Sequence, residues 1–393
     1  MKLIQHSVQA LQTVLVSNHK DLARLYSKYT KAERHLLEEG FHAGQRPDSL
    51  FQPITGHSDS DWISAHPEEH QDFESFYRDP SRKTPNASHN TIYIQTIGSF
   101  GKAGAQTDQC VEWLREYCQA FFYGLSVKLL PAVTVAETKC SFRVNSNSHN
   151  LQILTGDLLQ FLWSRKPTDA FCIVGITMIN LYPKDSWNLV FGQASLSNGM
   201  RVSASPGSSA VGWTDELHLG SCYKTAHCVS GGPSHSSRKV NSPCKPRVAA
   251  VFLVSTNKGS LYFQTPRLAS QLFVAAQEPG CNIWGLIMTH EIGHMFGLKP
   301  CQWLSCVMQP GSNHLEESDR RPLDFCPVCL RKLQVAIGFK IADQYKALVH
   351  WMEVDQTPEE ASTCQSLLHF PKPTEAFQTS RLWLHRCLDI LRE

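Results

Sequence analysis

Two histidines and a glutamate lie within one five-residue segment, and this spacing is typical of a catalytic zinc site. His290 and His294 are four residues apart, and Glu291 directly follows the first of them. Side chains four residues apart lie over one another on a helix, so both imidazoles can bind one metal ion while the carboxylate lies beside a metal-bound water. Zinc lowers the pKa of such a water from about 15.7 towards about 7, and a carboxylate can then take its proton. The chemistry that this pattern predicts is hydrolysis of a peptide bond.

Such a short motif can also arise by chance in a chain with 18 histidines, as an exposed helical turn with a charge contact. The neighbouring residues favour a buried helix instead, because apolar side chains precede the motif and run through it: Ile283, Trp284, Leu286, Ile287, Met288, Ile292, Met295, Phe296 and Leu298. Imidazoles and a carboxylate in a buried helix need a partner, and a metal ion would supply it. Gly297 is expected to break the helix after the motif.

Four cysteines follow this helix as two close pairs. Cys301 and Cys306 form the first pair, Cys326 and Cys329 the second, and Met308 lies between the pairs. Four thiolates in this arrangement suit a closed tetrahedral zinc site. Chance spacing or two disulfides are the alternatives, and a chain without an export signal disfavours disulfides.

These residues resemble the pattern of the archaemetzincins, a family of zinc metallopeptidases also called archaelysins. The family pattern is H-E-x-x-H-x-x-G-x-x-H-C-x4-C-x-M, followed further along the chain by C-x-x-C. The resemblance implies that His290 and His294 bind the catalytic zinc and that Glu291 is the general base. It implies that Gly297 forms the turn, that Met308 forms the Met-turn beneath the metal, and that the four cysteines hold a second, structural zinc.

One position departs from the family pattern, because Pro300 stands where the family has its third zinc ligand, a histidine. Proline has no side-chain donor, so the sequence offers two identified ligands for a site that normally has three and a water. The loss predicts weak or absent catalysis. An extra water, His314 from the following loop or a cysteine such as Cys301 would have to replace the ligand, and the sequence favours none of these. A non-catalytic, zinc-binding scaffold that binds peptides is therefore the alternative function.

Composition limits the partners of the chain. Its 393 residues are 42% hydrophobic, which is enough for the core of one large or two modest domains. With 37 basic and 35 acidic residues and no basic stripe, a nucleic-acid partner is not expected. The N-terminus lacks an apolar signal core and no apolar run reaches about 18 residues, so membrane insertion is not expected either. We expect an intracellular protein, cytoplasmic or nuclear, whose partner is a peptide or protein substrate. The oligomeric state is not set by the sequence.

The remaining cysteines carry less information. Fourteen cysteines in an intracellular chain are expected to be thiols and metal ligands rather than a disulfide framework. A third metal site is conceivable in a cluster whose spacing fits no ligand pattern, so a coincidental grouping is favoured for Cys222, His227, Cys228, His235 and Cys244.

Strands that alternate with helices predict an α/β (α+β) fold, and the family resemblance implies the metzincin-like zincin type. It should contain a twisted mixed sheet, the active-site helix and a C-terminal four-cysteine zinc site. The apolar patterns predict strands over residues 91–97, 127–130, 170–177 and 187–194. They predict a helical pair within residues 1–44 and helices over residues 107–124, 151–163, 331–353 and 375–392.

The predicted organisation has three parts: an N-terminal helical region and linker, a metzincin-like catalytic domain, and a C-terminal linker and helix, spanning residues 1–89, 90–353 and 354–393. The structural zinc segment within the catalytic domain covers residues 301–329.

Similarity to the family extends over most of residues 1–198 and 287–393. The interval at 198–285 contains Ser-, Gly- and Pro-rich runs and is expected to be an irregular insert, as loop or disorder. In metzincin-like folds an edge strand before the zinc helix pairs with extended substrate. Only residues 248–255 and 261–264 are candidates for strands here. A genuine insert, an alternative exon and an imperfect gene model would each explain this interval.

Overall fold

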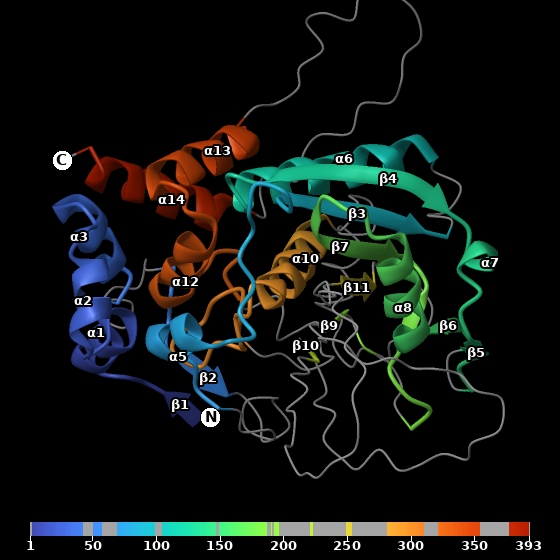
Figure 1. Ribbon diagram of the computed structural model, residues 1–393, viewed down its shortest axis with the longest axis horizontal. Helices are drawn as coiled ribbons and strands as arrows, with labels where there is room; N and C mark the ends of the chain where they lie inside the picture. Colours follow the sequence, from blue (N-terminus) through green and yellow to red (C-terminus); the bar gives the residue numbers. More distant parts are fainter. Residues whose placement is uncertain are drawn as a thin grey trace, which may run out of the picture.

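A mixed six-stranded sheet lies at the centre of the computed structural model of the chain (Figure 1). The residues that the structure describes are 2–41, 50–56, 69–98, 104–146, 149–186, 190, 192–195, 221–222, 249–253, 281–309, 321–353 and 377–392. The strands of this sheet are β3 (Thr91–Ile97), β4 (Ser126–Val133), β7 (Ala170–Thr177), β9 (Gly192–Ser195), β10 (Ser221–Cys222) and β11 (Ala249–Leu253). The predicted α/β class with a mixed sheet is confirmed.

The order of the strands places the longest ones at the centre and one end of the sheet. The order is β10-β9-β11-β7-β3-β4, in which β4, β3, β7 and β11 run parallel and β9 runs antiparallel to β11. Every residue of β7 is buried, as expected for a parallel strand with helices on both faces of its sheet. Strand β9 lies near the other end, where only the short β10 follows it.

Helices cover both faces of the sheet. Helices α6 (Gly104–Phe121) and α10 (Cys281–Met295) lie on one face, and α8 (Thr155–Arg165) lies on the other. Successive side chains of β3 point to opposite faces of the sheet. Ile92 and Ile94 belong to the core that contains the α6 and α10 side chains. Tyr93, between them, belongs to a second core with the apolar side chains of α8. The sheet thus fixes α10, the helix with the histidine pair, against its surface.

A second, three-stranded sheet corrects one prediction. It consists of β5 (Phe142–Val144), β6 (Leu151–Leu154) and β8 (Asn180–Tyr182), and the short helix α7 (Val135–Thr138) precedes it. The sequence predicted one helix over residues 151–163, but the first four of these residues form β6 and the helix α8 begins only at Thr155. The apolar residues of this stretch fit a strand followed by a helix as well as one longer helix.

The remaining elements gather at one end of the molecule, next to the sheet (Figure 1). They are β1 (Lys2–Ile4), which pairs with β2 (Ile54–Gly56), and the helices α1 (Val8–Val16), α2 (Lys20–Tyr26), α3 (Lys31–Glu39), α5 (Phe73–Arg78), α12 (Pro327–Ile337), α13 (Ile341–Glu353) and α14 (Gln378–Ile390). The predicted N-terminal helical pair is therefore three short helices, and Thr30 separates the last two with a capping box that starts α3.

A single predicted helix over residues 331–353 is also wrong, because two helices occupy this range. Helix α12 ends at Gly338, whose φ of +89° is a left-handed conformation that favours glycine. Helix α13 then begins at Ile341. The helical spacing of the apolar residues continues across the break, so the sequence pattern does not reveal the break.

A buried arginine joins the N-terminal helices to α12. Arg331 is fully buried and donates from Nη1 to the Leu15 carbonyl and from Nη2 to the Leu22 carbonyl, the latter at 3.2 Å. Its guanidinium lies 3.5 Å from the centre of the Phe73 ring. Residues from α1, α3, α12 and α14 also share one hydrophobic core with α10. The predicted domain boundaries after residues 89 and 353 remain a prediction.

The interval at 198–285 contributes one central strand. Strand β11 lies between β7 and β9, within the candidate strand at residues 248–255. The irregular insert itself remains a prediction. The second candidate, residues 261–264, lies outside the described residues, as does most of this interval.

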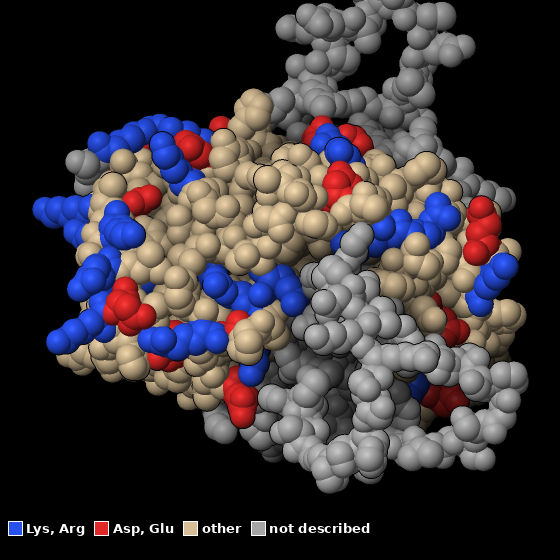
Figure 2. Space-filling model, in the orientation of Figure 1, with Lys and Arg blue, Asp and Glu red and all other residues tan. Residues whose placement is uncertain are grey.

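The surface carries charges of both signs. On the face shown in Figure 2, Lys and Arg side chains are most frequent at the end formed by the N-terminal helices, with Asp and Glu side chains among them. Some of these charges form ion pairs: Arg78 contacts Asp21 at 3.3 Å and Glu74 at 3.1 Å. Within the described part of the chain, no helix has both the length and the apolar character needed to cross a membrane.

Candidate functional site

The two histidines of α10 point their ring nitrogens at each other. His290 is 5% exposed and His294 is fully buried, and their Nε2 atoms are 3.1 Å apart. The Nδ1 atom of His290 lies 2.8 Å from the Val307 carbonyl oxygen, and that of His294 lies 2.6 Å from the Leu298 carbonyl oxygen. Because a carbonyl only accepts, each Nδ1 is the donor, and the Nε2 atoms of the neutral rings keep their lone pairs.

This arrangement fits a metal ion between the rings. Two nitrogen ligands at a Zn–N distance of about 2.0–2.1 Å in a tetrahedral site are about 3.4 Å apart, close to the observed separation. Burial lowers the pKa of His294 to about 4, and burial together with the neighbouring His294 lowers the pKa of His290 well below its usual range. Both imidazoles are thus held neutral, which is the form that binds a metal. Hydrogen bonds from Nδ1 to backbone carbonyls are also typical of metal-binding histidines.

The carboxylate of Glu291 lies between α10 and the sheet. Its side chain is only 2% exposed, and it packs against the backbone of Gly192 on β9. A Cβ atom at position 192 would lie 2.8 Å from Cδ of Glu291 and closer still to Oε1, so any larger residue there would require this carboxylate to move. The sequence analysis did not identify Gly192, although it placed a strand over this position.

The helix ends in a glycine turn, as predicted. Gly297 has a φ of +92°, its N–H donates to the His294 carbonyl at 2.8 Å, and the N–H of Leu298 donates to the Gly293 carbonyl at 3.3 Å. These two bonds form a Schellman motif with glycine at the left-handed position. The turn brings the Leu298 carbonyl back to Nδ1 of His294.

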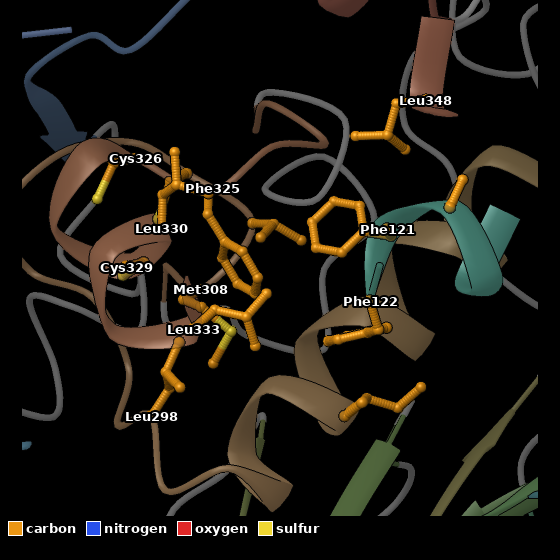
Figure 3. Packing of buried hydrophobic residues seen from close by; sticks show 14 of the residues in the cluster. Phe121, Phe122, Leu298, Met308, Phe325, Cys326, Cys329, Leu330, Leu333 and Leu348 are labelled. Carbon is orange, nitrogen blue, oxygen red and sulfur yellow. The ribbon is translucent and has the colours of Figure 1, made fainter. Parts of the chain in front are cut away.

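Met308 lies against the helix that carries the histidines. It is fully buried, and a Cβ atom at Gly293 would lie 2.5 Å from its sulfur, so the thioether contacts the backbone between His290 and His294. Figure 3 shows Met308 beside Phe325 and Leu333. The Met-turn role that the family resemblance implies for Met308 stays a prediction.

The four cysteines come together as the sequence predicted. All four are buried free thiols, and one ligand atom from each lies within 4.8 Å of the others in the set Cys301, Cys306, Cys326 and Cys329. The Sγ atoms of Cys301 and Cys326 are 3.7 Å apart, close to the separation of about 3.8 Å that tetrahedral geometry gives for a Zn–S distance of about 2.3 Å. This distance is far longer than a disulfide bond of about 2.05 Å. The donor set therefore fits a closed zinc site.

The local sequence explains how the second cysteine pair is placed. Cys326 is the N-cap of α12, Pro327 occupies the first turn, and Cys329 follows within that turn, as Figure 3 shows for the two cysteines. Proline is favoured at this position because its missing N–H has no partner within the helix.

Backbone hydrogen bonds connect the histidine pair to the cysteine cluster. Val307 follows Cys306; its carbonyl accepts from His290, and its N–H donates to the Asp324 carbonyl at 3.0 Å. The N–H of Cys301 donates to the Met308 carbonyl at 2.6 Å. The two sites are therefore neighbours that share one stretch of backbone.

Pro300, at the position of the family's third ligand, is buried and directly precedes Cys301. Of the replacements considered for that ligand, Cys301 belongs to the cysteine cluster, and His314 lies outside the described residues. Among the described residues, the cysteine cluster is the one group of three or more potential ligands. The grouping that the sequence analysis judged coincidental lies mostly outside them, from His227 to Cys244.

Similarity to known proteins includes the segment that carries the histidine pair and the four cysteines. Residues 286–335 match the family model described as peptidase family M54. The chain is 45% identical over 401 residues to archaemetzincin-2 of Homo sapiens and 46% identical over 398 residues to archaemetzincin-2 of Mus musculus, in each case over 100% of both chains. It is 32% identical to archaemetzincin-1 of Mus musculus, over 88% of this chain and 62% of that one.

A solved archaemetzincin from Methanopyrus kandleri is 20% identical and covers 65% of this chain and 99% of that chain, with a TM-score of 0.36. The full-length identity to the two archaemetzincin-2 proteins decides the assignment. The chain belongs to the archaemetzincins, the zinc metallopeptidases of peptidase family M54.

Proposed function

We propose that this chain hydrolyses peptide bonds in a peptide or protein substrate, with one zinc ion at the histidine pair and a second at the cysteine cluster. The facing Nε2 atoms of His290 and His294 carry this proposal, because two buried ring nitrogens 3.1 Å apart are placed to share one cation. When bound, zinc supplies a Lewis acid that polarises the substrate carbonyl and activates water.

Each residue of the site has a proposed task. His290 and His294 hold the ion, and the Val307 and Leu298 carbonyls orient their rings. Glu291 accepts the proton of the attacking water and passes it to the leaving amine. Gly192 leaves space for this carboxylate, and its strand, β9, brings the sheet to the site. Met308 packs beneath the pair, and the cysteine zinc fixes the segment that carries Val307.

The proline at position 300 makes the histidine site weaker than a site with three histidines. A catalytic zinc normally has three protein ligands, and the described residues show two imidazoles at this site. We propose that the cysteine-bound ion is held tightly and the histidine-bound ion loosely. Full-length similarity to archaemetzincin-2 does not favour the alternative of a non-catalytic scaffold.

The test is a zinc count combined with peptidase assays. The parent chain should bind about two zinc ions when zinc is supplied, and His290→Ala should bind one fewer. Glu291→Ala should keep the ion and lose peptidase activity. A parent chain that binds only one ion, or that cleaves no peptide with both ions bound, would contradict the proposal.

A further inference from the structure

We infer that Gln71 is a positioning residue for His294 and that Lys332 holds it in place. Gln71 precedes α5 and is 226 residues away from the turn that it contacts, and its side chain is only 3% exposed. The inference rests on the proposed function, because it concerns the ring that would bind the catalytic zinc.

The side-chain amide of Gln71 forms hydrogen bonds with the residues before and after Leu298. Nε2 of Gln71 donates to the Gly297 carbonyl at 3.0 Å, and Oε1 accepts from the N–H of Lys299 at 2.9 Å. The carbonyl of Leu298, between these two, accepts from Nδ1 of His294 at 2.6 Å. The side chain of Gln71 therefore fixes the backbone that sets the direction of the His294 ring.

A buried lysine fixes the side chain of Gln71 in turn. Lys332 on α12 is 2% exposed, and its Nζ donates to the backbone oxygen of Gln71 at 2.5 Å and to Oε1 at 3.1 Å. An ammonium group requires an acceptor, so it selects the amide orientation in which Oε1 faces Lys332 and Nε2 faces Gly297. Its charge also polarises the amide and strengthens the hydrogen bond that Nε2 donates.

Gln71 also binds the chain after Pro300. The backbone oxygen of Gln71 accepts from Nε1 of Trp303 at 3.1 Å. Gln71 therefore forms hydrogen bonds with Gly297, Lys299 and Trp303. Pro300 and Cys301 lie between Lys299 and Trp303 in the chain. These hydrogen bonds support the segment around Pro300 from outside, and through Leu298 they support the His294 imidazole.

The test is the affinity of the loosely held zinc ion, measured by competition with a chelator. Gln71→Met has a similar length and removes both amide hydrogen bonds, so zinc should bind about 10–100-fold more weakly, as is typical when a partner of a metal-binding histidine is lost. Gln71→Glu keeps the acceptor for Lys299 and pairs with Lys332, but places an acceptor against the Gly297 carbonyl. It should also bind zinc more weakly while it melts close to the parent temperature, so it carries the test if Gln71→Met does not fold.

Gln344→Met is the matched control. Gln344 is 1% exposed and donates from Nε2 to the Phe121 carbonyl at 2.6 Å, so its loss removes an equally buried amide hydrogen bond on α13. Its zinc affinity should equal that of the parent. If Gln344→Met weakens zinc binding as much as Gln71→Met, the effect is general destabilisation and the inference is wrong.

His294→Ala separates this inference from the proposed function. This variant should bind one zinc ion fewer than the parent. If it does, and the Gln71 variants hold zinc as tightly as the parent, the positioning role alone is overturned. If His294→Ala keeps both ions, the proposed zinc site itself is overturned.

Discussion

The carboxylate of Glu291 on α10 lies directly against the backbone of Gly192 on β9, and this contact joins the proposed general base to the sheet. Glycine at this position allows the observed placement of the carboxylate, because a Cβ atom there would lie only 2.8 Å from Cδ of Glu291. Strand β9 holds this position through its antiparallel pairing with β11, in which Gly192 lies opposite Phe252.

Replacement of Gly192 therefore tests the role of the carboxylate. Gly192→Ala should displace the side chain of Glu291 and reduce the turnover number by at least about 10-fold, because a small misplacement of a catalytic group has large effects. Zinc content should remain that of the parent, because the atoms nearest to the new methyl group belong to Glu291 and not to a histidine. Ala194→Gly, two residues along the same strand, is the control for weakening β9, and it should lose stability rather than turnover per folded molecule. Equal turnover of Gly192→Ala and the parent would show that Glu291 does not need its observed position.

The chemistry-bearing residues could be predicted because their signals are local. The spacing of His290 and His294 on one helix and the paired cysteines need only a few neighbouring residues to be recognised. The buried strands β3 and β7 were predicted with their observed bounds. For β7 the reason is its near-continuous apolar run, which is typical of a strand covered on both faces.

The supporting residues could not be predicted, because their partners are distant in sequence. Gln71 contacts a turn 226 residues away, and Arg331 contacts a carbonyl 316 residues away. A lone glutamine or arginine carries no spacing signal, and a buried arginine is unusual. Gly192 likewise gains its importance from Glu291, which only the folded sheet brings to it. Strand β11 was recognised as a candidate, but its central place in the sheet depends on pairing with β7 and β9.

The proline in place of the family's third ligand leads to a gain-of-function prediction. Pro300→His should strengthen zinc binding at the histidine pair by at least about 10-fold and raise peptidase activity, because it restores a third imidazole. Pro300 is buried, and both of its neighbours are fixed by backbone hydrogen bonds. The N–H of Lys299 donates to the side chain of Gln71, and the N–H of Cys301 donates to the Met308 carbonyl. Chelator competition and peptidase assays are the measurements.

Pro300→Ala is the control for the loss of proline, because it changes the backbone without adding a donor. Its zinc affinity should stay at the parent level. If Pro300→His changes neither zinc affinity nor activity, position 300 does not face the metal.

The cysteine cluster should contribute to folding through its metal. Cys326→Ser removes one of the four thiolates and should lower both the zinc content and the melting temperature, since structural zinc stabilises the fold that forms its site. Cys118→Ser is a matched control, because Cys118 is equally buried but lies on α6, outside the cluster. The control should keep the parent zinc content. Identical melting curves and zinc contents for the two variants would contradict a structural zinc at these cysteines.

A buried aspartate near the cluster predicts how stability depends on pH. Burial raises the pKa of Asp324 from 3.8 to about 6, although a 2.6 Å hydrogen bond from Ser380 opposes this shift. The folded-state pKa lies above the unfolded value, so the protonated form favours folding; this contribution is complete below about pH 3.8 and is lost as the pH rises through about 6. A shift of this size corresponds to about 3 kcal/mol.

Asp324→Asn removes the cost of ionising this side chain while keeping an oxygen that can accept the Ser380 hydroxyl. The free energy of unfolding of this variant, measured by denaturant titration, should therefore exceed that of the parent at pH 8, and the difference should shrink as the pH falls to 5. A constant difference between Asp324→Asn and the parent across this range would mean that Asp324 stays ionised at pH 5, and the raised pKa would then be wrong.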